Sequence, residues 1–373
     1  MCIKKIALLG CTGSIGTTAL NVLRRYKNEY KLEIIANNKD IEGLKKIEKE
    51  FKPKIVFCNT GYLSIDRTEQ PFIKEFLSNP ETYKDVDIVI NGIVGLAGLA
   101  PTLAVIEAGK ILATANKESL VCAGNLINDK LNKLKSEIRP VDSEHSTIWQ
   151  CIGNNKSNIK SLILTASGGA FRNLNKSELM NAKAIDALKH PNWVMGKKVT
   201  IDCATLVNKG MEIIEAKHLF GIKDIQTIQH NESIIHSLVQ MKDGTLIAGL
   251  SNPNMEIPIQ YALTYPKRKE TAVKYLDLCE WGSLTFKKLD ENRFPCLQIC
   301  KKVSEYGDYA GTILNAADEI AVDMYLKDKI GFYGISDIID AALQKFGFNG
   351  KINDIKDIFS IDKEVKEYII RSF

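Results

Sequence analysis

The chain lacks the features that mark membrane-spanning and disulfide-stapled proteins. No apolar run approaches the length of a transmembrane helix, and the nine cysteines are odd in number and scattered, with no C-x-x-C pair. Such cysteine usage favours a reducing compartment over a disulfide framework or a zinc site. The sequence also runs from Met1 straight into a predicted strand, without a signal or transit segment. We therefore expect a cytoplasmic protein.

A strong charge of one sign is lacking as well. The formal net charge is only +5, and the lysines between Lys39 and Lys52 alternate with glutamates and apolar residues, which is typical of a solvated helix face. No basic arm or DNA-binding helix stands out, so neither nucleic acid nor a membrane is an expected partner. A mildly basic chain is compatible with an anionic small molecule. Its length of 373 residues indicates two or three globular domains.

A glycine-rich turn follows the first predicted strand, residues 3–9. Gly10, Gly13 and Gly16 have the spacing G-x-x-G-x-x-G, and residues 17–26 after them have a helical pattern. A strand, a glycine turn and a helix begin a dinucleotide-binding fold, in which the backbone approaches a pyrophosphate at the helix N-terminus. The candidate cofactor contacts are Thr12, Gly13, Ser14 and Ile15. A purely structural turn is the alternative.

The end of the second predicted strand, residues 32–36, bears on which cofactor binds. NAD-binding folds usually place an acidic residue there, to bond the ribose 2′-hydroxyl. Here Asn37, Asn38 and Lys39 follow, and Lys39 suits a 2′-phosphate. This favours NADPH, although the neighbouring Asp40 argues for caution and Lys39 as an ordinary surface lysine stays open.

Further strand and helix patterns alternate through the first 140 residues. Strands are predicted at 54–57, 86–90 and 111–114, with helices from Pro101 and over 117–134. This alternation predicts a parallel, doubly wound sheet. Lys117 follows the strand 111–114, at the edge of the sheet where such folds keep reactive groups.

Two carboxylates, Asp142 and Glu144, follow the apolar run 138–141. In an extended backbone they would project to the same side. Two adjacent carboxylates repel one another unless a cation lies between them, and Mg2+ or Mn2+ takes such oxygen ligands. An exposed acidic turn is the alternative.

Three later segments combine polar residues with special backbone chemistry. Ser167 and two glycines follow a predicted strand at 159–164, in a loop suited to wrapping N–H groups around a phosphate. His190 and Trp193 flank a proline turn, where a structural histidine is the more common case. A predicted strand at 198–201 leads to a helix on which Asn208, Lys209 and Glu212 share one face. Glu212 is a candidate third metal ligand, with a solvated, salt-bridged face as the alternative. Gly210, inside this helix, indicates close approach of another backbone or a ligand.

Eight motifs, in order over nearly the whole chain, resemble the 1-deoxy-D-xylulose 5-phosphate reductoisomerase family. They are residues 10–16, 115–120, 140–146, 167–169, 190–193, 208–212, 235–237 and 314–319. The resemblance implies a Rossmann-like NADPH-binding domain (1–142), a central α+β catalytic domain with a sheet (143–264), a linker (265–292) and a C-terminal α-helical domain (293–373), assembled as a homodimer. It implies isomerisation and reduction of 1-deoxy-D-xylulose 5-phosphate to 2-C-methyl-D-erythritol 4-phosphate, in the non-mevalonate isoprenoid precursor pathway. The implied cofactors are NADPH and Mg2+ or Mn2+, with Co2+ a further candidate.

The resemblance also assigns roles to single residues. It gives metal binding to Asp142, Glu144 and Glu212, and catalysis to Lys117, Glu144 and His190. The substrate phosphate would be bound by Ser167, Asn208 and Lys209, with His190 closing over it. Ser143, Lys117, Glu144 and Glu212 would contact the rest of the substrate. Trp193 and Met255 would cover the site, the latter in a flap at 251–256, and Asn116 and Glu118 would join the NADPH contacts.

Three positions depart from the family pattern. Cys203 replaces a usual serine at the phosphate site, Asn38 replaces a usual glycine and Asp318 replaces a usual asparagine. Because a thiol is a weaker hydrogen-bond donor than a hydroxyl, Cys203 is expected to weaken phosphate binding unless neighbours compensate. Two other readings stay open: another NADP-dependent sugar-phosphate or semialdehyde dehydrogenase, and a non-catalytic nucleotide-sensing homologue.

The last part of the chain has patterns of a hairpin followed by helices. Asp243 and Gly244 predict a hairpin turn between strands 234–241 and 245–250. Helices are predicted at 297–303, 312–326, 336–346 and 362–370. We expect this C-terminal region to brace the other domains without supplying catalytic residues.

Overall fold

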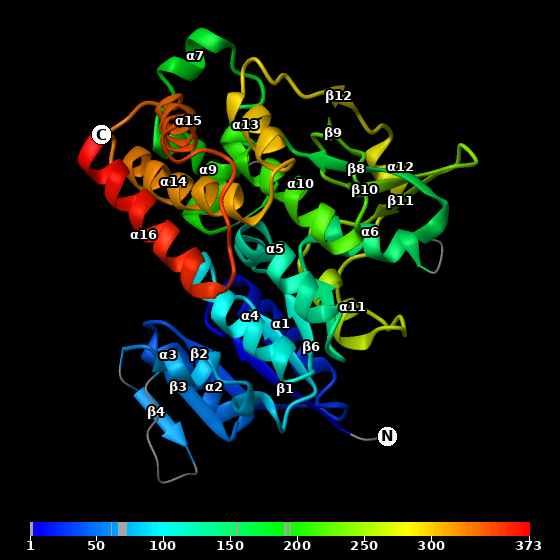
Figure 1. The fold of residues 1–373 in the computed structure, drawn as a ribbon. Helices are drawn as coiled ribbons and strands as arrows, with labels where there is room; N and C mark the ends of the chain where they lie inside the picture. The colour runs from blue at the N-terminus through cyan, green and yellow to red at the C-terminus, as the bar shows by residue number, and fades with distance from the viewer. Residues whose placement is uncertain (1–2, 61, 66–72, 154–155, 190–191, 194) are drawn as a thin grey trace. The chain divides into compact units, whose positions relative to one another are not determined.

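The structure, a computed structural model, describes residues 3–60, 62–65, 73–153, 156–189, 192–193 and 195–373 (Figure 1). The chain forms two compact units. The first unit comprises Met1–Ser119, Ile127–Ser146 and Asn254–Val273; the second comprises Leu120–Leu126, Thr147–Pro253 and Lys274–Phe373. The finer division into three domains and a linker stays a prediction.

A seven-stranded sheet of order β4-β3-β2-β1-β5-β6-β7 forms the centre of the first unit. It is parallel except for β4, which runs antiparallel to β3. Its strands are β1 (Lys4–Leu9), β2 (Tyr30–Asn37), β3 (Ile55–Cys58), β4 (Tyr62–Ile65), β5 (Ile88–Asn91), β6 (Ile111–Thr114) and β7 (Glu137–Pro140). The predicted doubly wound sheet is therefore confirmed, and the antiparallel β4 is an addition that the sequence patterns did not show.

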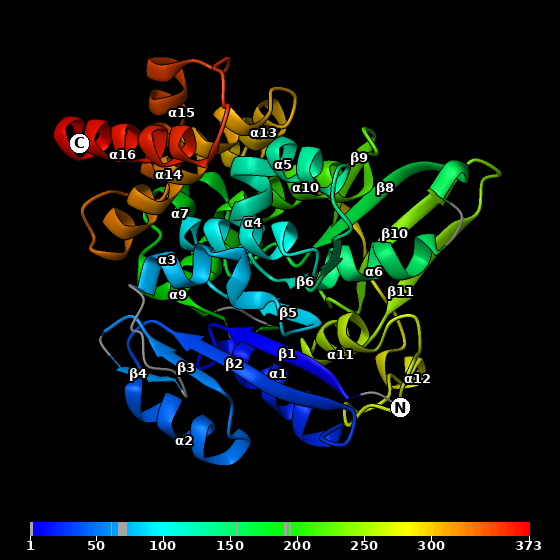
Figure 2. The same cartoon turned by 60° about the horizontal axis from the view of Figure 1, so that its bottom comes forward.

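Helices cover both faces of this sheet (Figure 2). On one face lie α1 (Ser14–Arg25), α2 (Ile41–Phe51) and α11 (Glu256–Thr264); on the other lie α3 (Ile73–Ser78) and α4 (Leu99–Glu107). Although α11 comes from far along the chain, Ile259 and Leu263 are buried in the same core as Leu20 and Leu23 of α1. The buried Arg139 of β7 donates to the Ala262 carbonyl at 2.8 Å, which fixes α11 in this unit. α5 (Lys117–Leu131) has residues in both units.

The second unit contains a five-stranded sheet of order β11-β10-β8-β9-β12. Its strands are β8 (Ile159–Ala166), β9 (Ile225–Gln229), β10 (Ile235–Met241), β11 (Leu246–Leu250) and β12 (Lys287–Lys288). β10 is antiparallel to both neighbours, and the predicted hairpin turn is present, with Gly244 at φ +93° and the Asp243 carboxylate accepting from the Thr245 N–H at 2.8 Å. β12 lies inside the predicted linker, so part of that segment belongs to the sheet.

Helices pack around this second sheet and against one another. They are α6 (Ser143–Ile152, whose residues up to Ser146 belong to the first unit), α7 (Lys176–Met180), α8 (Ala184–Ala187), α9 (Lys197–Thr205), α10 (Val207–Phe220), α12 (Leu278–Trp281), α13 (Pro295–Val303), α14 (Asp308–Leu326), α15 (Gly334–Phe346) and α16 (Ile355–Ser372). α10 packs on β8 and β9 and beside α13, while α14 packs against α15 and α16. The four predicted C-terminal helices are confirmed, each beginning before its predicted start.

The predicted strand at 198–201 is wrong, because these residues belong to α9. The β-branched residues Val199, Thr200 and Ile201 suggested a strand. In the helix, Lys198 and Asp202 pair across one turn at 2.7 Å, and Ile201 is buried in the core. Tertiary packing and this ion pair therefore override the local strand preference.

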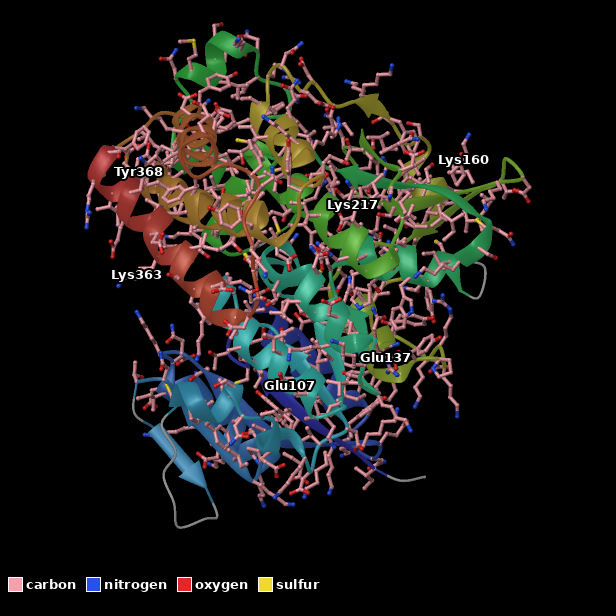
Figure 3. The ribbon with its side chains drawn as sticks, in the orientation of Figure 1. Glu107, Glu137, Lys160, Lys217, Lys363 and Tyr368 are labelled. Atoms are coloured by element: carbon pink, nitrogen blue, oxygen red, sulfur yellow. The ribbon has the colours of Figure 1, made fainter. Side chains whose placement is uncertain are left out.

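Charged side chains lie on the outside of both units, among them Glu107, Lys160 and Lys363 (Figure 3). Within the described part of the chain, no helix is long and apolar enough to cross a membrane. The cysteines that the structure describes are all free thiols, as the scattered cysteine pattern predicts.

Candidate functional site

The glycine turn between β1 and α1 is built by close backbone packing. Gly10 has φ +79°, and a Cβ on it would lie 2.6 Å from the Gly92 carbonyl oxygen at the end of β5. A Cβ on Gly16 would lie 2.3 Å from the Gly10 oxygen. Gly13 precedes α1, and no side chain caps this helix N-terminus. The turn thus presents the start of α1 at the carboxyl edge of the sheet, an arrangement suited to a pyrophosphate.

In the loop after β2, some side chains hold the loop in place and one is exposed to solvent. Asp40 caps α2, since its carboxylate accepts from the Gly43 N–H at 2.8 Å. Asn37 donates to the Asp40 carbonyl at 2.6 Å and to the Thr12 hydroxyl at 3.2 Å, joining this loop to the glycine turn. Lys39 is exposed. The carboxylate that argued against a 2′-phosphate therefore has a helix-capping role, and Lys39 remains available to an anion.

Asn116 and Glu118 form a buried polar junction at the start of α5. The Asn116 amide donates to the carbonyls of Ile93 and Gly95 at 2.7 and 2.9 Å, and its oxygen caps the Ser119 N–H at 3.0 Å. It also donates to Glu118 at 3.2 Å. These contacts fix the loop after β5 and orient Lys117, which ion-pairs with Asp142 at 2.9 Å.

The two predicted metal carboxylates lie where β7 ends and α6 begins. The extended-backbone argument for them is wrong, because α6 starts at Ser143. The Asp142 carboxylate accepts from the Glu144 N–H at 3.1 Å, and the Ser143 hydroxyl donates to Glu144 at 2.5 Å. His145 is fully buried, with Nδ1 3.5 Å from Asp142. Asp142 and Glu144 are brought together by the first turn of a helix, with Lys117 supplying the opposing charge.

The Ser167 loop follows β8 in the second unit. Gly168 and Gly169 have φ +79° and +66°, and a Cβ on Gly169 would lie 2.6 Å from the Cys203 carbonyl oxygen. The Ser167 hydroxyl accepts from the Gly169 N–H at 3.2 Å. Only glycine permits this contact, so the loop lies directly against the end of α9 at Cys203.

The break between α9 and α10 sets up the second part of this site. Leu206 adopts φ +65°, a rare conformation for a non-glycine residue, and ends α9 so that α10 begins anew at Val207. Asn208 then donates to Glu212 at 2.5 Å, and Lys209 forms an ion pair with the same carboxylate. The predicted shared face is confirmed. It is buried, since Lys209 is 4% and Glu212 1% exposed.

Gly210 has a structural explanation that the sequence left open. A Cβ on it would lie 2.2 Å from the Cys300 Cβ. The close approach is therefore a side chain of α13.

Sequence reasoning also missed Glu215, a second carboxylate of α10 that is 1% exposed, although its i, i+3 spacing from Glu212 was visible.

Asp318, one of the departures from the family pattern, has a partner in the second unit. Lys198 of α9 forms ion pairs with both Asp318 of α14 and Asp202. Asp318 is fully buried, and burial raises its pKa, partly offset by the Lys198 ammonium. The carboxylate thus joins α14 to α9, the helix that carries Cys203.

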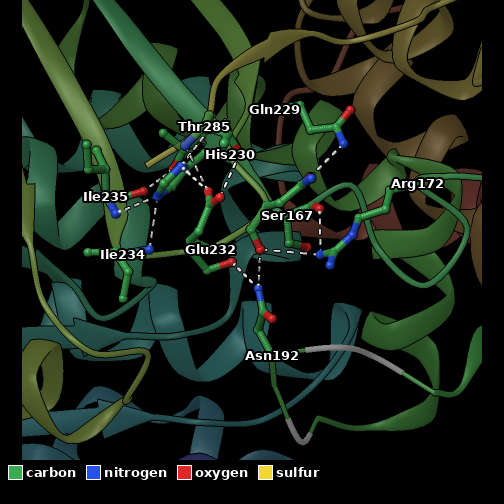
Figure 4. Close-up of polar contacts among 12 residues, drawn as sticks. Ser167, Arg172, Asn192, Gln229, His230, Glu232, Ile234, Ile235 and Thr285 are labelled. Atoms are coloured by element: carbon green, nitrogen blue, oxygen red, sulfur yellow. Dashed lines mark hydrogen bonds and ion pairs between the residues drawn. The ribbon is translucent and has the colours of Figure 1, made fainter. Parts of the chain in front are cut away.

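The predicted covering residues Trp193 and Met255 belong to different units. His190 lies outside the described residues. The Trp193 ring contacts the His236 ring edge-on at 6.2 Å, and Asn192 beside it donates to the Asn231 carbonyl at 2.7 Å (Figure 4). Met255 belongs to the first unit, where it directly precedes α11 and packs against the core.

Comparison with known proteins covers nearly the whole chain. Family models described as 1-deoxy-D-xylulose 5-phosphate reductoisomerase, its C-terminal domain, and the DXP reductoisomerase C-terminal domain match residues 6–124, 138–220 and 250–368. The reductoisomerase of Clostridium botulinum (strain Langeland) is 42% identical over 99% of both chains, and that of Caldanaerobacter subterraneus subsp. tengcongensis is 44% identical over 99% of both. The chain belongs to the 1-deoxy-D-xylulose 5-phosphate reductoisomerase family.

Solved structures of reductoisomerases agree with this assignment. A DOX-P reductoisomerase in complex with NADPH, fosmidomycin and magnesium is 36% identical, with a TM-score of 0.91 over 99% of this chain and 98% of that one. The Zymomonas mobilis reductoisomerase in complex with NADPH is 33% identical, with a TM-score of 0.91 over 99% of both chains. The reductoisomerase fold was thus predicted correctly from the ordered motifs.

The donor groups of this reductoisomerase chain fit a hard divalent ion. Asp142 and Glu144 supply carboxylate oxygens on the first unit, and Glu212 supplies them on the second. Oxygen donors are what Mg2+ and Mn2+ prefer. Each unit also balances its carboxylates with a lysine, through the Lys117–Asp142 and Lys209–Glu212 pairs.

Proposed function

We propose that this chain isomerises and reduces 1-deoxy-D-xylulose 5-phosphate to 2-C-methyl-D-erythritol 4-phosphate, with NADPH and a divalent metal ion, in the supply of isoprenoid precursors. The observation that carries the proposal is the match to reductoisomerases over 99% of the chain at 42% identity. The intact polar residues of both units support it, because a non-catalytic homologue would have no need to retain them.

Asp142, Glu144 and Glu212 are the proposed ligands of Mg2+ or Mn2+. When bound there, the ion supplies Lewis-acid stabilisation of negative charge that develops on substrate oxygens. Lys117 lies beside Asp142 and Ser143 beside Glu144, and both are proposed to contact the substrate hydroxyl and carbonyl groups. Their hydrogen bonds orient the reacting carbons while the skeleton rearranges, an effect of positioning.

The phosphate anchor is proposed to comprise Ser167, Asn208 and Lys209, with His190 closing over it. The Lys209 ammonium and the start of α10 present positive charge, and both lie on one rigid helix. The N–H groups of the Ser167-Gly168-Gly169 loop add donors. Cys203 lies beside this loop, and we propose that the neighbouring donors compensate for its weak thiol donor.

NADPH supplies the hydride for the reduction step. We propose that the glycine turn, with Thr12, Gly13, Ser14 and Ile15, holds its pyrophosphate. Asn37, Asn38 and Lys39 are proposed to meet the 2′-phosphate, with Asn116 and Glu118 placing the strand end near the cofactor. Trp193 and Met255 are proposed to cover the site and exclude water.

The homodimer and the cytoplasmic location are part of the same proposal. Apolar side chains are exposed in the segment around α12, where Leu278 is 55%, Trp281 41% and Phe286 49% exposed. β11 is the edge strand of its sheet and carries the exposed Leu246 and Leu250. Exposed apolar residues and an open sheet edge favour association with a second copy. The free thiols favour a reducing compartment.

Metal-dependent oxidation of NADPH by 1-deoxy-D-xylulose 5-phosphate tests the proposal. The rate is expected to vanish with EDTA and to return when Mn2+ or Mg2+ is added in excess. NADH is expected to be a much poorer donor, since it lacks the phosphate that Lys39 meets. Turnover that persists in EDTA, or no turnover with fresh Mn2+, would rule the function out.

A further inference from the structure

A tight turn, residues 230–234 between β9 and β10, lies at the centre of the polar network in Figure 4. Its first residue, His230, is fully buried, and its N–H donates to the Ala166 carbonyl at 2.8 Å. Ala166 is the residue before Ser167. The turn therefore begins beside the loop that is proposed to bind the substrate phosphate.

The His230 imidazole fixes the shape of this turn. Its Nε2 faces the N–H groups of Ile234 and Ile235, each at 3.1 Å, and must accept from both. The proton is therefore on Nδ1, which lies 3.0 Å from the Thr285 carbonyl and 3.0 Å from Glu232. The ring also stacks on Phe286 at 5.0 Å. One side chain thus closes the turn internally and ties it to residues 285–286.

The carbonyl of Asn231 is the point where two functional segments meet. It accepts from the Asn192 amide at 2.7 Å and from the Arg172 guanidinium at 3.3 Å. The same Arg172 nitrogen also donates to the Ser167 carbonyl at 3.4 Å. One backbone oxygen therefore links the Ser167 loop to the segment that carries Trp193.

Ser233 completes the tether of Asn192. Its hydroxyl lies 2.8 Å from the Asn192 amide nitrogen, and its backbone holds φ +54°. A positive φ in a non-glycine residue costs free energy and persists where the surroundings impose it. The conformation aims the Ser233 hydroxyl and the Asn231 carbonyl at the same amide group.

We infer that Asn192 is a positioning residue for the reductoisomerase reaction, and that the His230–Ser233 turn is the fixed support through which it holds Trp193 over the substrate. The inference rests on the proposed function for its kinetic consequence, whereas the tether itself does not. Asn192 acts by donating two hydrogen bonds, so the role depends on its amide nitrogen and not on side-chain bulk.

Asn192→Ala and Asn192→Asp test this chemistry. Aspartate retains the size of the side chain but loses the N–H donors, so both variants are expected to raise KM for 1-deoxy-D-xylulose 5-phosphate roughly tenfold, the effect of losing about 1.4 kcal/mol of hydrogen bonding. KM for NADPH should stay unchanged. Asn181→Ala is the matched control, since it removes an exposed amide that donates locally, to the Ser177 carbonyl at 3.2 Å. Wild-type KM in Asn192→Asp would overturn the inference.

A double-variant cycle tests the route through Ser233. Ser233→Ala removes the hydroxyl and is expected to raise the substrate KM by a few-fold. In the Asn192→Ala background the same change should have no further effect, because the partner is already gone. If the increases in substrate KM from the two single variants multiply in the double variant, Ser233 acts independently of Asn192, and the proposed route would be overturned.

Trp193 fluorescence separates this inference from the proposed function. The chain has three tryptophans, so the Trp149→Phe/Trp281→Phe protein reports on Trp193 alone. Adding Asn192→Ala should shift the emission to longer wavelength as the indole loses its fixed place. An unshifted spectrum would overturn the tether, even in an active enzyme. Absence of turnover in the wild type would refute the proposed function and leave this spectral result decisive for the tether.

Discussion

At the residue scale, the acidic residues after β7 have two simultaneous tasks. The Asp142 carboxylate accepts a hydrogen bond from the Glu144 N–H at the start of α6 and forms an ion pair with Lys117. In the proposed function, Asp142 and Glu144 are also metal ligands. A side chain that is already held by the protein has little freedom to lose when it binds an ion. The local bonds therefore preorganise the ligands.

Glu144→Gln separates metal binding from cofactor binding. The amide is a poor ligand, so turnover is expected to fall by roughly a hundredfold or more, as several kcal/mol of charge stabilisation are lost. NADPH affinity, measured by titration of the nucleotide, should remain unchanged. Glu107→Gln is the control, because this surface residue pairs with Lys130, at 2.6 Å, on the outside of the first unit. Loss of NADPH binding in Glu144→Gln would contradict the proposed role of Glu144 as a metal ligand that does not bind the cofactor.

His218 predicts an acid-dependent loss of stability. Burial, with a smaller contribution from the Lys217 charge, lowers its pKa from 6.5 to about 4. The unfolded chain therefore binds this proton more readily than the folded one, and stability falls as the pH drops from about 6.5 to about 4. The loss is at most about 3 kcal/mol.

Unfolding by urea at several pH values checks this expectation. Other carboxylates also titrate in acid, so the relevant quantity is the difference between the wild type and His218→Gln. The variant should show a shallower decline between pH 6.5 and 4. Parallel stability curves would contradict the assignment to His218.

At the element scale, glycines mark where helices approach one another. A Cβ on Gly311 of α14 would lie 2.0 Å from the Val121 carbonyl oxygen in α5. Nearby, the Asp308 carboxylate accepts from the N–H groups of Asn125 and Leu126, at 2.9 and 3.1 Å, just after the non-helical Ala123. α14 therefore packs backbone to backbone on a kink in α5 and caps the helix that resumes after it.

Gly311→Ala is expected to lower the free energy of unfolding by about 1–3 kcal/mol or more, since backbone must move to admit the methyl group. Gly331→Ala is the matched control: the nearest atom to its Cβ would be 3.9 Å away, and the change should stay within about 0.5 kcal/mol. Chemical denaturation measures both. Equal stabilities would mean that α5 and α14 do not pack this closely.

Sequence patterns predicted elements well where local and tertiary preferences agree. The apolar strands of the first sheet and the amphipathic C-terminal helices follow directly from their periodicity. The strand at 198–201 failed because Lys198 finds partners on α9 and α14 that no local pattern reveals. The carboxylate pair at 142 and 144 was predicted on an extended backbone, whereas a helix start brings these residues together; their role as metal ligands stays a prediction.

The polar network around His230 could not be predicted from sequence patterns. Its bonds join β8, the turn after β9, the segment at 192 and residue 285, so that Thr165 and Thr285 of one network are 120 positions apart in the chain. Many of these hydrogen bonds are accepted by backbone carbonyls, which every residue has, so the residue types do not reveal them. The family motifs indicated Ser167, Asn208 and Lys209, but nothing in the pattern indicated Asn231 or Ser233.

At the scale of the whole molecule, the proposed homodimer predicts a particle of about twice 41.6 kDa. Sedimentation at several protein concentrations measures it. Replacing the exposed Leu278 and Trp281 by serine is expected to weaken association, since apolar surface drives it. A monomer at every concentration would contradict the proposed dimer but would leave the proposed reaction untested.

The identity of the reaction product tests the central claim most directly. Purified protein, NADPH, Mn2+ and 1-deoxy-D-xylulose 5-phosphate should yield 2-C-methyl-D-erythritol 4-phosphate, whose branched carbon skeleton is distinguished by NMR from that of the substrate. A simple dehydrogenase would reduce the ketone and leave the chain of carbons unbranched. The branched product is the predicted result, and an unbranched polyol phosphate, or no product, would contradict the account.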